Sequence, residues 1–335
     1  MKISAKAPCR VDLAGGTLDI WPLYLYHDGA VTVNFAVDRY ASCALETRDD
    51  SRIVLESKDM KGAETFESLD QLVAANRYRL PLVAYLVRFF RPKTGITLVT
   101  DSEAPAGAGI SGSSTLIIAV SSALNRLTGA GYKIEKIREI SQNVEAQIIR
   151  VPTGAQDYYP AMYGGVSAIE LTAAGIERKA IPVDLNELNE RVVLAYTGAP
   201  RNSGINNWEV TKAHIDGDRK VHRNFDRIAE IAIAMRAALE HSDWNEAGRL
   251  LRQEWSHRRK NAPGISTPLI DRLVAVTRRA GALGAKACGA GGGGCVVFLA
   301  EQGRKAAVAA AIEREGATVL PITVAAKGVS LKVSG

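Results

Sequence analysis

The chain has 335 residues, of which 47% are hydrophobic, and a formal net charge of +6 from 42 basic and 36 acidic side chains. This length predicts about two domains of an ordinary globular protein. The basic residues are dispersed, which argues against a nucleic-acid partner. No apolar run reaches the length of a membrane span and the first residues lack a signal-peptide core, so we expect a cytoplasmic protein with no membrane partner. The sequence does not indicate an oligomeric state.

Residues 1 to about 185 have the pattern of a mixed domain. Alternating and β-branched segments predict strands near residues 2–7, 30–37, 41–46, 52–57 and 96–100. Apolar residues at helical spacing predict helices near residues 82–90, 115–127 and 134–150. A glycine pair at residues 164–165 predicts a turn before another strand.

From about residue 190 the pattern changes to long helices. We predict helices near residues 224–240, 244–259, 268–280 and 304–314. Strands are predicted near residues 192–196, 295–299 and 318–323. The change occurs within residues 185–190, which gives two predicted domains, 1–187 and 188–335.

Cysteine and histidine residues give no indication of a metal site. The spacing of the four cysteines, Cys9, Cys43, Cys288 and Cys295, matches no zinc or redox motif. The five histidines are scattered along the chain, so we predict no histidine-based metal site.

Glycine and serine are concentrated in one segment, Ala104-Pro-Ala-Gly-Ala-Gly-Ile-Ser-Gly-Ser-Ser-Thr115. It joins a predicted strand to a predicted helix, whose first N–H groups are free and carry partial positive charge. Glycine lets the backbone approach a ligand closely, so the segment fits a bound phosphate, with a flexible turn as the alternative. Ser113 stands where a Walker A loop has lysine, which argues against a standard P-loop. A dinucleotide-binding unit needs an acid at the end of the next strand, and the nearest candidate, Glu135, opens a predicted helix.

Two further glycine-rich segments accompany this loop. Residues 7–19 read APCRVDLAGGTLD and follow the first predicted strand, and residues 286–295 read KACGAGGGGC and precede a late one. Any one of the three segments could be a turn. Three of them, each beside a strand or a helix, suggest backbone packed closely around a ligand.

Two acidic residues follow the middle glycine segment. Glu145 borders the apolar stripe of the helix predicted near residues 134–150, and Asp157 lies in the loop Pro152-Thr-Gly-Ala-Gln-Asp157. Such carboxylates could share a Mg²⁺ ion, which favours one or two carboxylates together with phosphate oxygens. The alternative is a solvated glutamate and an aspartate that caps a turn.

The three glycine segments, in this order, resemble the signatures of the GHMP kinases, which include galactokinase, homoserine kinase and mevalonate kinase. The second motif of that family reads roughly P-x-G-x-G-L-G-S-S-A, and this chain has Pro105-Ala-Gly-Ala-Gly-Ile-Ser-Gly-Ser-Ser114. The resemblance spans the chain from Ala7 to Leu299. It implies an α+β fold with an N-terminal ribosomal-protein-S5-like, ATP-binding domain and a C-terminal ferredoxin-like α/β domain. It also implies phosphoryl transfer to a hydroxyl group, with ATP and Mg²⁺ as cofactors.

The resemblance assigns roles to individual residues. It implies that Ser113 and Glu145 hold Mg²⁺. Asp157 would act on the acceptor hydroxyl, while Arg10 would hold Asp157 and stabilise charge on the transferred group. The implied ATP-binding residues are Pro105, Gly107, Ala108, Gly109, Ile110, Ser111, Gly112, Ser113 and Ser114. The implied substrate contacts are Asp19, Gly16, Thr17, Arg201 and Gly291.

Some of these roles have alternatives. For Arg201 the alternative, given equal weight, is a solvated surface arginine. The 289–294 glycine loop is expected to pack against residues 104–115, which we call the phosphate loop. The alternative is that it acts as a hinge. We assign no ligand role to Trp208, Trp244 and Trp255, which are expected in the core.

Within the family, the likeness is strongest to bacterial kinases of D-glycero-D-manno-heptose phosphate, with the kinase part of fucokinase nearby. It is carried by Tyr196-Thr-Gly-Ala-Pro-Arg-Asn-Ser203 and by Gly281-Ala-Leu-Gly-Ala-Lys286 before the last glycine run. Residues 14–19 depart from the usual A-G-G-G-T-D, residues 111–112 transpose Gly-Ser, and Tyr158 replaces a glutamine. We therefore expect a sugar or sugar-phosphate acceptor, most of all of the heptose-7-phosphate type. The alternatives are galactose, fucose, a uronic acid or a mevalonate-like alcohol, or a non-catalytic sugar and ATP sensor.

Overall fold

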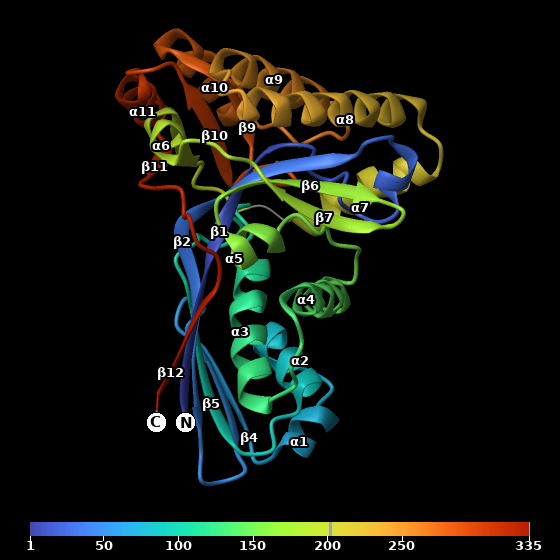
Figure 1. Ribbon diagram of the computed structural model, residues 1–335, viewed down its shortest axis with the longest axis vertical. Helices are drawn as coiled ribbons and strands as arrows, with labels where there is room; N and C mark the ends of the chain where they lie inside the picture. The colour runs from blue at the N-terminus through green and yellow to red at the C-terminus, as the bar shows by residue number, and fades with distance from the viewer. Residues whose placement is uncertain (201–202, 335) are drawn as a thin grey trace.

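A computed structural model describes residues 1–200 and 203–334, which form two β-sheets with helices packed against each (Figure 1). In this view most of the first sheet and its helices occupy the lower part of the molecule, β6 and β7 lie higher, and the second sheet lies at the upper left beneath the longest helices. The expected two-part α+β architecture is thus confirmed. The boundary between domains stays a prediction, and the helix α6 (Leu185–Arg191) lies at that position.

The first sheet has eight strands in the order β12-β1-β2-β5-β3-β4, with β6 and β7 attached beside β2. One edge of β2 pairs with β1, and its other edge has two partners, since residues 41–47 pair with β5 and residues 31–35 pair with β6. β12 pairs with β1 from residue 2 to residue 6, so the two ends of the described chain lie together (Figure 1). The strands are β1 (Lys2–Ala14), β2 (Val31–Thr47), β3 (Ile53–Ser57), β4 (Gly62–Phe66), β5 (Ile96–Ser102), β6 (Val166–Thr172), β7 (Gly175–Ala180) and β12 (Ser330–Ser334).

The helix α3 (Gly112–Thr128) lies at the centre of the layer that covers this sheet. It packs against β1 and β2 and touches α2, α4 and α5, so most of its surface is buried. Its sequence explains this position, because it carries no charged side chain before Arg126 and consists largely of aliphatic and small residues. The remaining helices of this part are η1 (Leu23–Tyr26), α1 (Leu69–Ala74), α2 (Pro81–Phe90), α4 (Ile134–Ile149) and α5 (Tyr158–Tyr163).

The second sheet is antiparallel, with the strand order β11-β8-β10-β9. In chain order this is fourth, first, third, second, which is the ferredoxin-like arrangement expected from the sequence. β10 is a continuous apolar run and is buried throughout, as a central strand should be. The elements are β8 (Val192–Tyr196), α7 (Ser203–Ile215), α8 (Arg219–Glu240), α9 (Trp244–Arg258), α10 (Pro268–Ala280), β9 (Ala282–Ala287), β10 (Cys295–Ala300), α11 (Lys305–Arg314) and β11 (Thr318–Leu320).

Two elements near the expected site differ from their predicted bounds. β1 continues to Ala14, so the first half of the glycine segment at residues 7–19 is strand rather than loop, and its side chains are buried on both faces. α3 begins at Gly112 instead of Thr115, which places Ser113 and Ser114 in its first turn. Both differences bring candidate residues onto rigid elements.

Candidate active site

A cavity of about 800 Å³ lies where the glycine segments converge. Its walls combine the phosphate loop with the 152–157 loop and the start of α3. Polar and charged side chains from several elements face it, which is the composition of a ligand site. Those that carry the argument below are Arg10, Thr17, Asp19, Ser113, Ser114, Glu145, Gln156 and Asp157.

The phosphate loop has the backbone of an anion cradle. Gly107 and Gly109 adopt positive φ, a conformation that glycine reaches without strain, and Ser111 does so at φ +62° despite its side chain. The helix α3 starts directly after this turn, so its first N–H groups have no partner within the helix. These groups and the helix dipole favour a negatively charged ligand at the floor of the cavity.

The glycine run of the second sheet packs on the phosphate loop, as the sequence predicted. The N–H of Cys295 donates to the carbonyl of Ala108 over 2.7 Å. Gly294 has φ +72°, and a Cβ there would lie 2.6 Å from the same carbonyl oxygen. Gly291 instead packs against the backbone of Ile265, and it is Gly289 and Ala290 that line the cavity.

Glu145 and Ser113 meet at one side of the cavity. The hydroxyl of Ser113 donates to one oxygen of Glu145 over 2.7 Å. The hydroxyls of Ser114 and Tyr158 donate to the other oxygen over 2.9 and 2.5 Å. Burial raises the pKa of Glu145, and among the described residues no lysine or arginine forms an ion pair with it. A carboxylate surrounded by hydroxyl oxygens, with no basic side chain to neutralise it, fits a Mg²⁺ site.

Asp157 lies opposite, held by Arg10. The guanidinium Nε and Nη2 both donate to one oxygen of Asp157, over 2.8 and 2.6 Å. The Nη1 atom donates to the carbonyl of Gly109 over 2.6 Å and to Asp12 over 3.2 Å. Although Asp157 precedes α5, its side chain makes no capping bond, so it does not act as the turn cap that was the alternative. Arg10 therefore ties the carboxylate to the phosphate loop.

Asp12, which contacts Arg10, belongs to a second, fully buried ion pair. Asp12 and Lys286 are both fully buried, and the ammonium of Lys286, on β9, donates to the carboxylate of Asp12, on β1. Asp12 also accepts the N–H of Gly289 over 2.9 Å. Burial alone would raise the pKa of Asp12, but Lys286 and Arg10 hold it well below its usual value. Sequence reasoning missed this pair, although both residues stood inside quoted motifs.

Asp19 lies in the wall next to Asp157. It is 2% exposed and accepts the N–H of Gln156 over 2.8 Å. A Cβ on Gly154 would lie 2.0 Å from its carboxylate oxygen, so a side chain there would displace the carboxylate from its position. Burial, followed by repulsion from Asp157, raises the pKa of Asp19 to about 6. A carboxylate kept in such a position suits a hydrogen bond to a ligand hydroxyl.

Gly16 and Thr17 hold the first glycine turn to α9. Arg258, paired with the buried Glu254, donates to the carbonyl of Gly16 over 2.6 Å and to the hydroxyl of Thr17 over 3.1 Å. Thr17 lines the cavity, whereas Gly16 faces Gln156 and Arg258. The Arg258 contact was not anticipated from the sequence.

α7 supplies a further wall, and Arg201 lies outside the described residues. Trp208, with Asn207 and Glu209, lines the cavity and is 42% exposed, so its predicted place in the core is wrong. Trp244 and Trp255 are buried, as expected.

Replacing Asp19 by asparagine is expected to stabilise the protein above pH 6. The raised pKa means that the folded state holds the Asp19 proton more tightly than the unfolded state, so ionisation between about pH 4 and 6 destabilises the fold. The neutral amide avoids this cost, which is at most about 3 kcal/mol. Thermal unfolding of D19N and wild type should coincide near pH 4 and diverge up to pH 6. The exposed Asp49→Asn serves as control, and a difference that is constant with pH would contradict the assignment.

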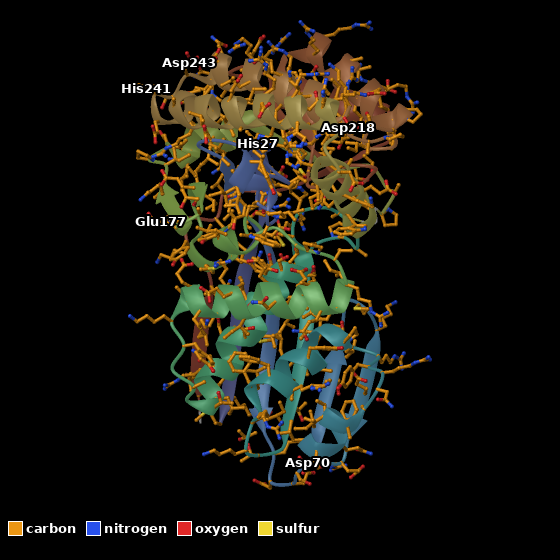
Figure 2. The ribbon with its side chains drawn as sticks, turned by 90° about the vertical axis from the view of Figure 1, so that its right-hand side faces the viewer. His27, Asp70, Glu177, Asp218, His241 and Asp243 are labelled. Carbon is orange, nitrogen blue, oxygen red and sulfur yellow. The ribbon has the colours of Figure 1, made fainter. Side chains whose placement is uncertain are left out.

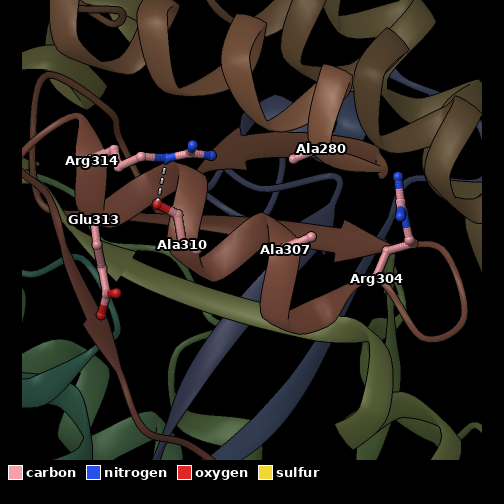
Figure 3. Close-up of a pocket in the computed structure, with 6 residues that line it drawn as sticks. All are labelled: Ala280, Arg304, Ala307, Ala310, Glu313 and Arg314. Atoms are coloured by element: carbon pink, nitrogen blue, oxygen red, sulfur yellow. Dashed lines mark hydrogen bonds between the residues drawn. The ribbon is translucent and has the colours of Figure 1, made fainter.

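A second hollow, of about 650 Å³, lies away from this site between α11 and the end of α10 (Figure 3). Alanine side chains and the stems of Arg304 and Arg314 line it, and Arg314 donates to a backbone carbonyl of its own helix. None of the residues predicted for the site lies there, so we assign it no part in the chemistry.

None of the described helices is long and apolar enough to cross a membrane. Two segments of the chain match models of known protein families. Residues 78–165 match "GHMP kinases N terminal domain", and residues 235–318 match "GHMP kinases C terminal". The first match contains the phosphate loop and both candidate acids.

Full-length relatives agree with these matches. The chain is 27% identical to a D-glycero-alpha-D-manno-heptose 7-phosphate kinase of Campylobacter jejuni, over 98% of each chain. It is also 27% identical to a mevalonate kinase of Thermococcus gammatolerans, over 99% of each. The crystal structure of a D-glycero-D-manno-heptose 1-phosphate kinase from Bacteroides thetaiotaomicron superimposes with a TM-score of 0.79 at 22% identity, covering 99% of this chain and 100% of the other. The chain therefore belongs to the GHMP kinase family and is a sugar-kinase-type phosphotransferase with an alcohol group as acceptor.

Proposed function

We propose that this protein transfers the γ-phosphoryl group of ATP to a hydroxyl of a heptose phosphate or a closely related sugar. The observation that carries the proposal is the convergence of two differently held carboxylates on one cavity. Glu145 faces the start of α3 among hydroxyl donors, and Asp157 faces it from the side of Arg10. The carboxylate of Glu145 suits a metal ion, and that of Asp157 suits an acceptor hydroxyl.

The nucleotide phosphates would lie on the backbone N–H groups of the phosphate loop and of the first turn of α3. Mg²⁺, when bound, would neutralise charge on the phosphates, held by the hydroxyl of Ser113 and the carboxylate of Glu145. Met60 and Leu82 line another part of the same cavity and offer apolar surface to the base.

The acceptor would enter on the side of Asp19 and α7. Its hydroxyl oxygen attacks the γ-phosphorus, the bond to the β-phosphate oxygen breaks, and ADP leaves. Asp157 accepts the hydrogen bond of the attacking hydroxyl and draws its proton, while Asp19 binds a neighbouring hydroxyl. Arg10 keeps Asp157 in place, and one of its five N–H groups remains for the transferred group.

A screen of ADP release tests both the reaction and the acceptor. Heptose 7-phosphate, heptose 1-phosphate, galactose, fucose, a uronic acid and mevalonate are offered with ATP and Mg²⁺. Turnover is expected to be greatest with a heptose phosphate, in line with the heptose kinases to which the chain is similar. Preferred turnover of another acceptor would replace the substrate but keep the reaction. Binding of ATP and sugars without any turnover would leave a sensor and refute the kinase mechanism.

Removing the hydroxyl of Ser113 is expected to weaken the metal site. Ser113→Ala takes away one of the two side chains proposed to hold Mg²⁺, and we expect the free Mg²⁺ concentration for half-maximal rate to rise about 10-fold. The rate is measured against free Mg²⁺ at fixed ATP. Ser122→Ala, on the same helix but away from Glu145, is the control. An unchanged Mg²⁺ dependence would remove Ser113 from the metal site.

A further inference from the structure

Three histidines meet at a point that the sequence did not reveal. His27 follows η1, His214 lies near the end of α7 and His222 lies in the first turns of α8. One ligand nitrogen from each lies within 4.8 Å of the other two. The prediction that histidines would not form a cluster is therefore wrong, because the fold joins positions almost two hundred residues apart. Figure 2 shows His27 inside the molecule beneath α8, whereas His241, beyond the far end of α8, lies at the surface.

One of these rings is already oriented as metal ligands usually are, and a second has one nitrogen held by an oxygen atom. The Nδ1 atom of His27 lies 2.8 Å from a carboxylate oxygen of Asp226. The Nε2 atom of His222 lies 2.8 Å from the backbone carbonyl oxygen of His214. A metal-bound histidine almost always donates its second ring N–H to a carboxylate or a carbonyl in this way. Each ring thereby keeps its other nitrogen unprotonated and available.

The third ring has an unmatched nitrogen. His214 is 1% exposed, its Nε2 lies 2.9 Å from the Nε2 of His27, and its Nδ1 has no hydrogen-bond partner among the described residues. Burial, followed by the nearby His222 and His27, lowers the pKa of His214 to about 4. An ion bound by the two Nε2 atoms of His27 and His214 would take the place of the proton that these atoms now share.

We propose that His27, His214 and His222 form a binding site for a first-row transition-metal ion of the Zn²⁺ class, separate from the Mg²⁺ site. Neutral imidazoles suit Zn²⁺, Cu²⁺, Ni²⁺ and Co²⁺, whereas Mg²⁺ and Ca²⁺ require oxygen ligands. Two imidazole nitrogens on a tetrahedral ion are about 3.3 Å apart, given Zn–N bonds of about 2.0–2.1 Å. The His27 and His214 nitrogens need to separate by only a few tenths of an ångström.

His222 completes the set by a rotation of its ring. Its ring now stacks on His214, with centroids 3.7 Å apart. It is the least buried of the three, so its side chain has room to turn its free nitrogen towards the ion. Water would supply the fourth ligand.

Such an ion would fasten α7 to the rest of the fold. It would join the end of α7 to α8 and to the segment after η1, while Trp208, near the middle of α7, lines the active-site cavity. Metal binding is therefore expected to stabilise the folded protein whether or not the proposed kinase reaction is correct.

The test uses the full-length, tag-free protein and ZnCl₂ or CoCl₂ alone as probes, in excess Mg²⁺ and without nucleotide. We expect one Co²⁺ per chain with the intense visible absorption of tetrahedral coordination, and one Zn²⁺ per chain that raises the unfolding temperature. His222→Ala is expected to weaken Zn²⁺ binding by about 100-fold, and Asp226→Asn by about 10-fold. His241→Ala, which alters an exposed histidine outside the cluster, should bind as wild type does.

Three results would overturn the site. They are less than stoichiometric uptake by wild type, octahedral Co²⁺ spectra, or equal affinity in wild type and His222→Ala. Asp226 is largely exposed, so Asp226→Asn keeps the fold intact and gives a readout even if His222→Ala fails to fold. Equal affinity in Asp226→Asn and wild type would then count against the proposal.

Discussion

Replacement of Asp157 by asparagine is expected to lower turnover by about 10²- to 10⁴-fold while ATP still binds. The amide has nearly the shape of the carboxylate but cannot accept the proton of the acceptor hydroxyl. The nucleotide contacts proposed on the phosphate loop do not involve this side chain. Single-turnover rates and the dissociation constant for ATP, measured on the same preparation, separate loss of chemistry from loss of binding.

The control for this experiment is Asp59→Asn, an acid that lines the same cavity but lies in the turn between β3 and β4. It should retain nearly wild-type turnover. Arg10 loses a charged partner in D157N, so unfolding of the variant is measured as well. A variant that is folded, binds ATP and turns over at close to the wild-type rate would remove Asp157 from the mechanism.

Replacing Lys286 by methionine is expected to lower the free energy of unfolding by about 3–5 kcal/mol. Methionine fills a similar volume, but it leaves the carboxylate of Asp12 buried without its ammonium partner. Among the described residues, the hydrogen bonds left to Asp12 would come from Arg10 and from the N–H of Gly289. Because Asp12 also positions Arg10, turnover should fall together with stability. Chemical denaturation and the steady-state rate give the two readouts.

Lys305→Met is the matched control, since Lys305 is half-buried but donates only to a backbone carbonyl. It should cost much less stability than Lys286→Met. The double variant Asp12→Asn, Lys286→Met removes both charges and is expected to recover part of the lost stability, because no unpaired charge remains. A loss below about 1 kcal/mol in Lys286→Met would show that the ion pair does not hold the two sheets together.

Most of the secondary structure could be predicted because its patterns are strong and local. β8 and α10 have the predicted bounds, since each is a clear periodic run flanked by breaks. β7 and β9 were not predicted for opposite reasons. β7 is polar and largely exposed, whereas β9 is a short run of small residues with one leucine and one lysine, which is buried beneath α9.

The sequence motifs were sufficient to predict which side chains of the candidate site lie together. The sequence predicted that Ser113 and Glu145 would lie together, and that Arg10 would hold Asp157, and these pairs are in contact. The roles of all four in catalysis stay predictions. Lys286 could not be singled out, because a lysine in a glycine-rich segment gives no sign that it is buried against a strand from the other end of the chain.

The pairing of β12 with β1 has a consequence for synthesis on the ribosome. The N–H and C=O groups along that edge of β1 stay unpaired until residues 330–334 have been translated. An open edge can recruit strands from other chains. Until that segment has been made, the nascent polypeptide therefore carries an aggregation-prone sheet edge, and chaperones that shield extended segments should matter most during that interval.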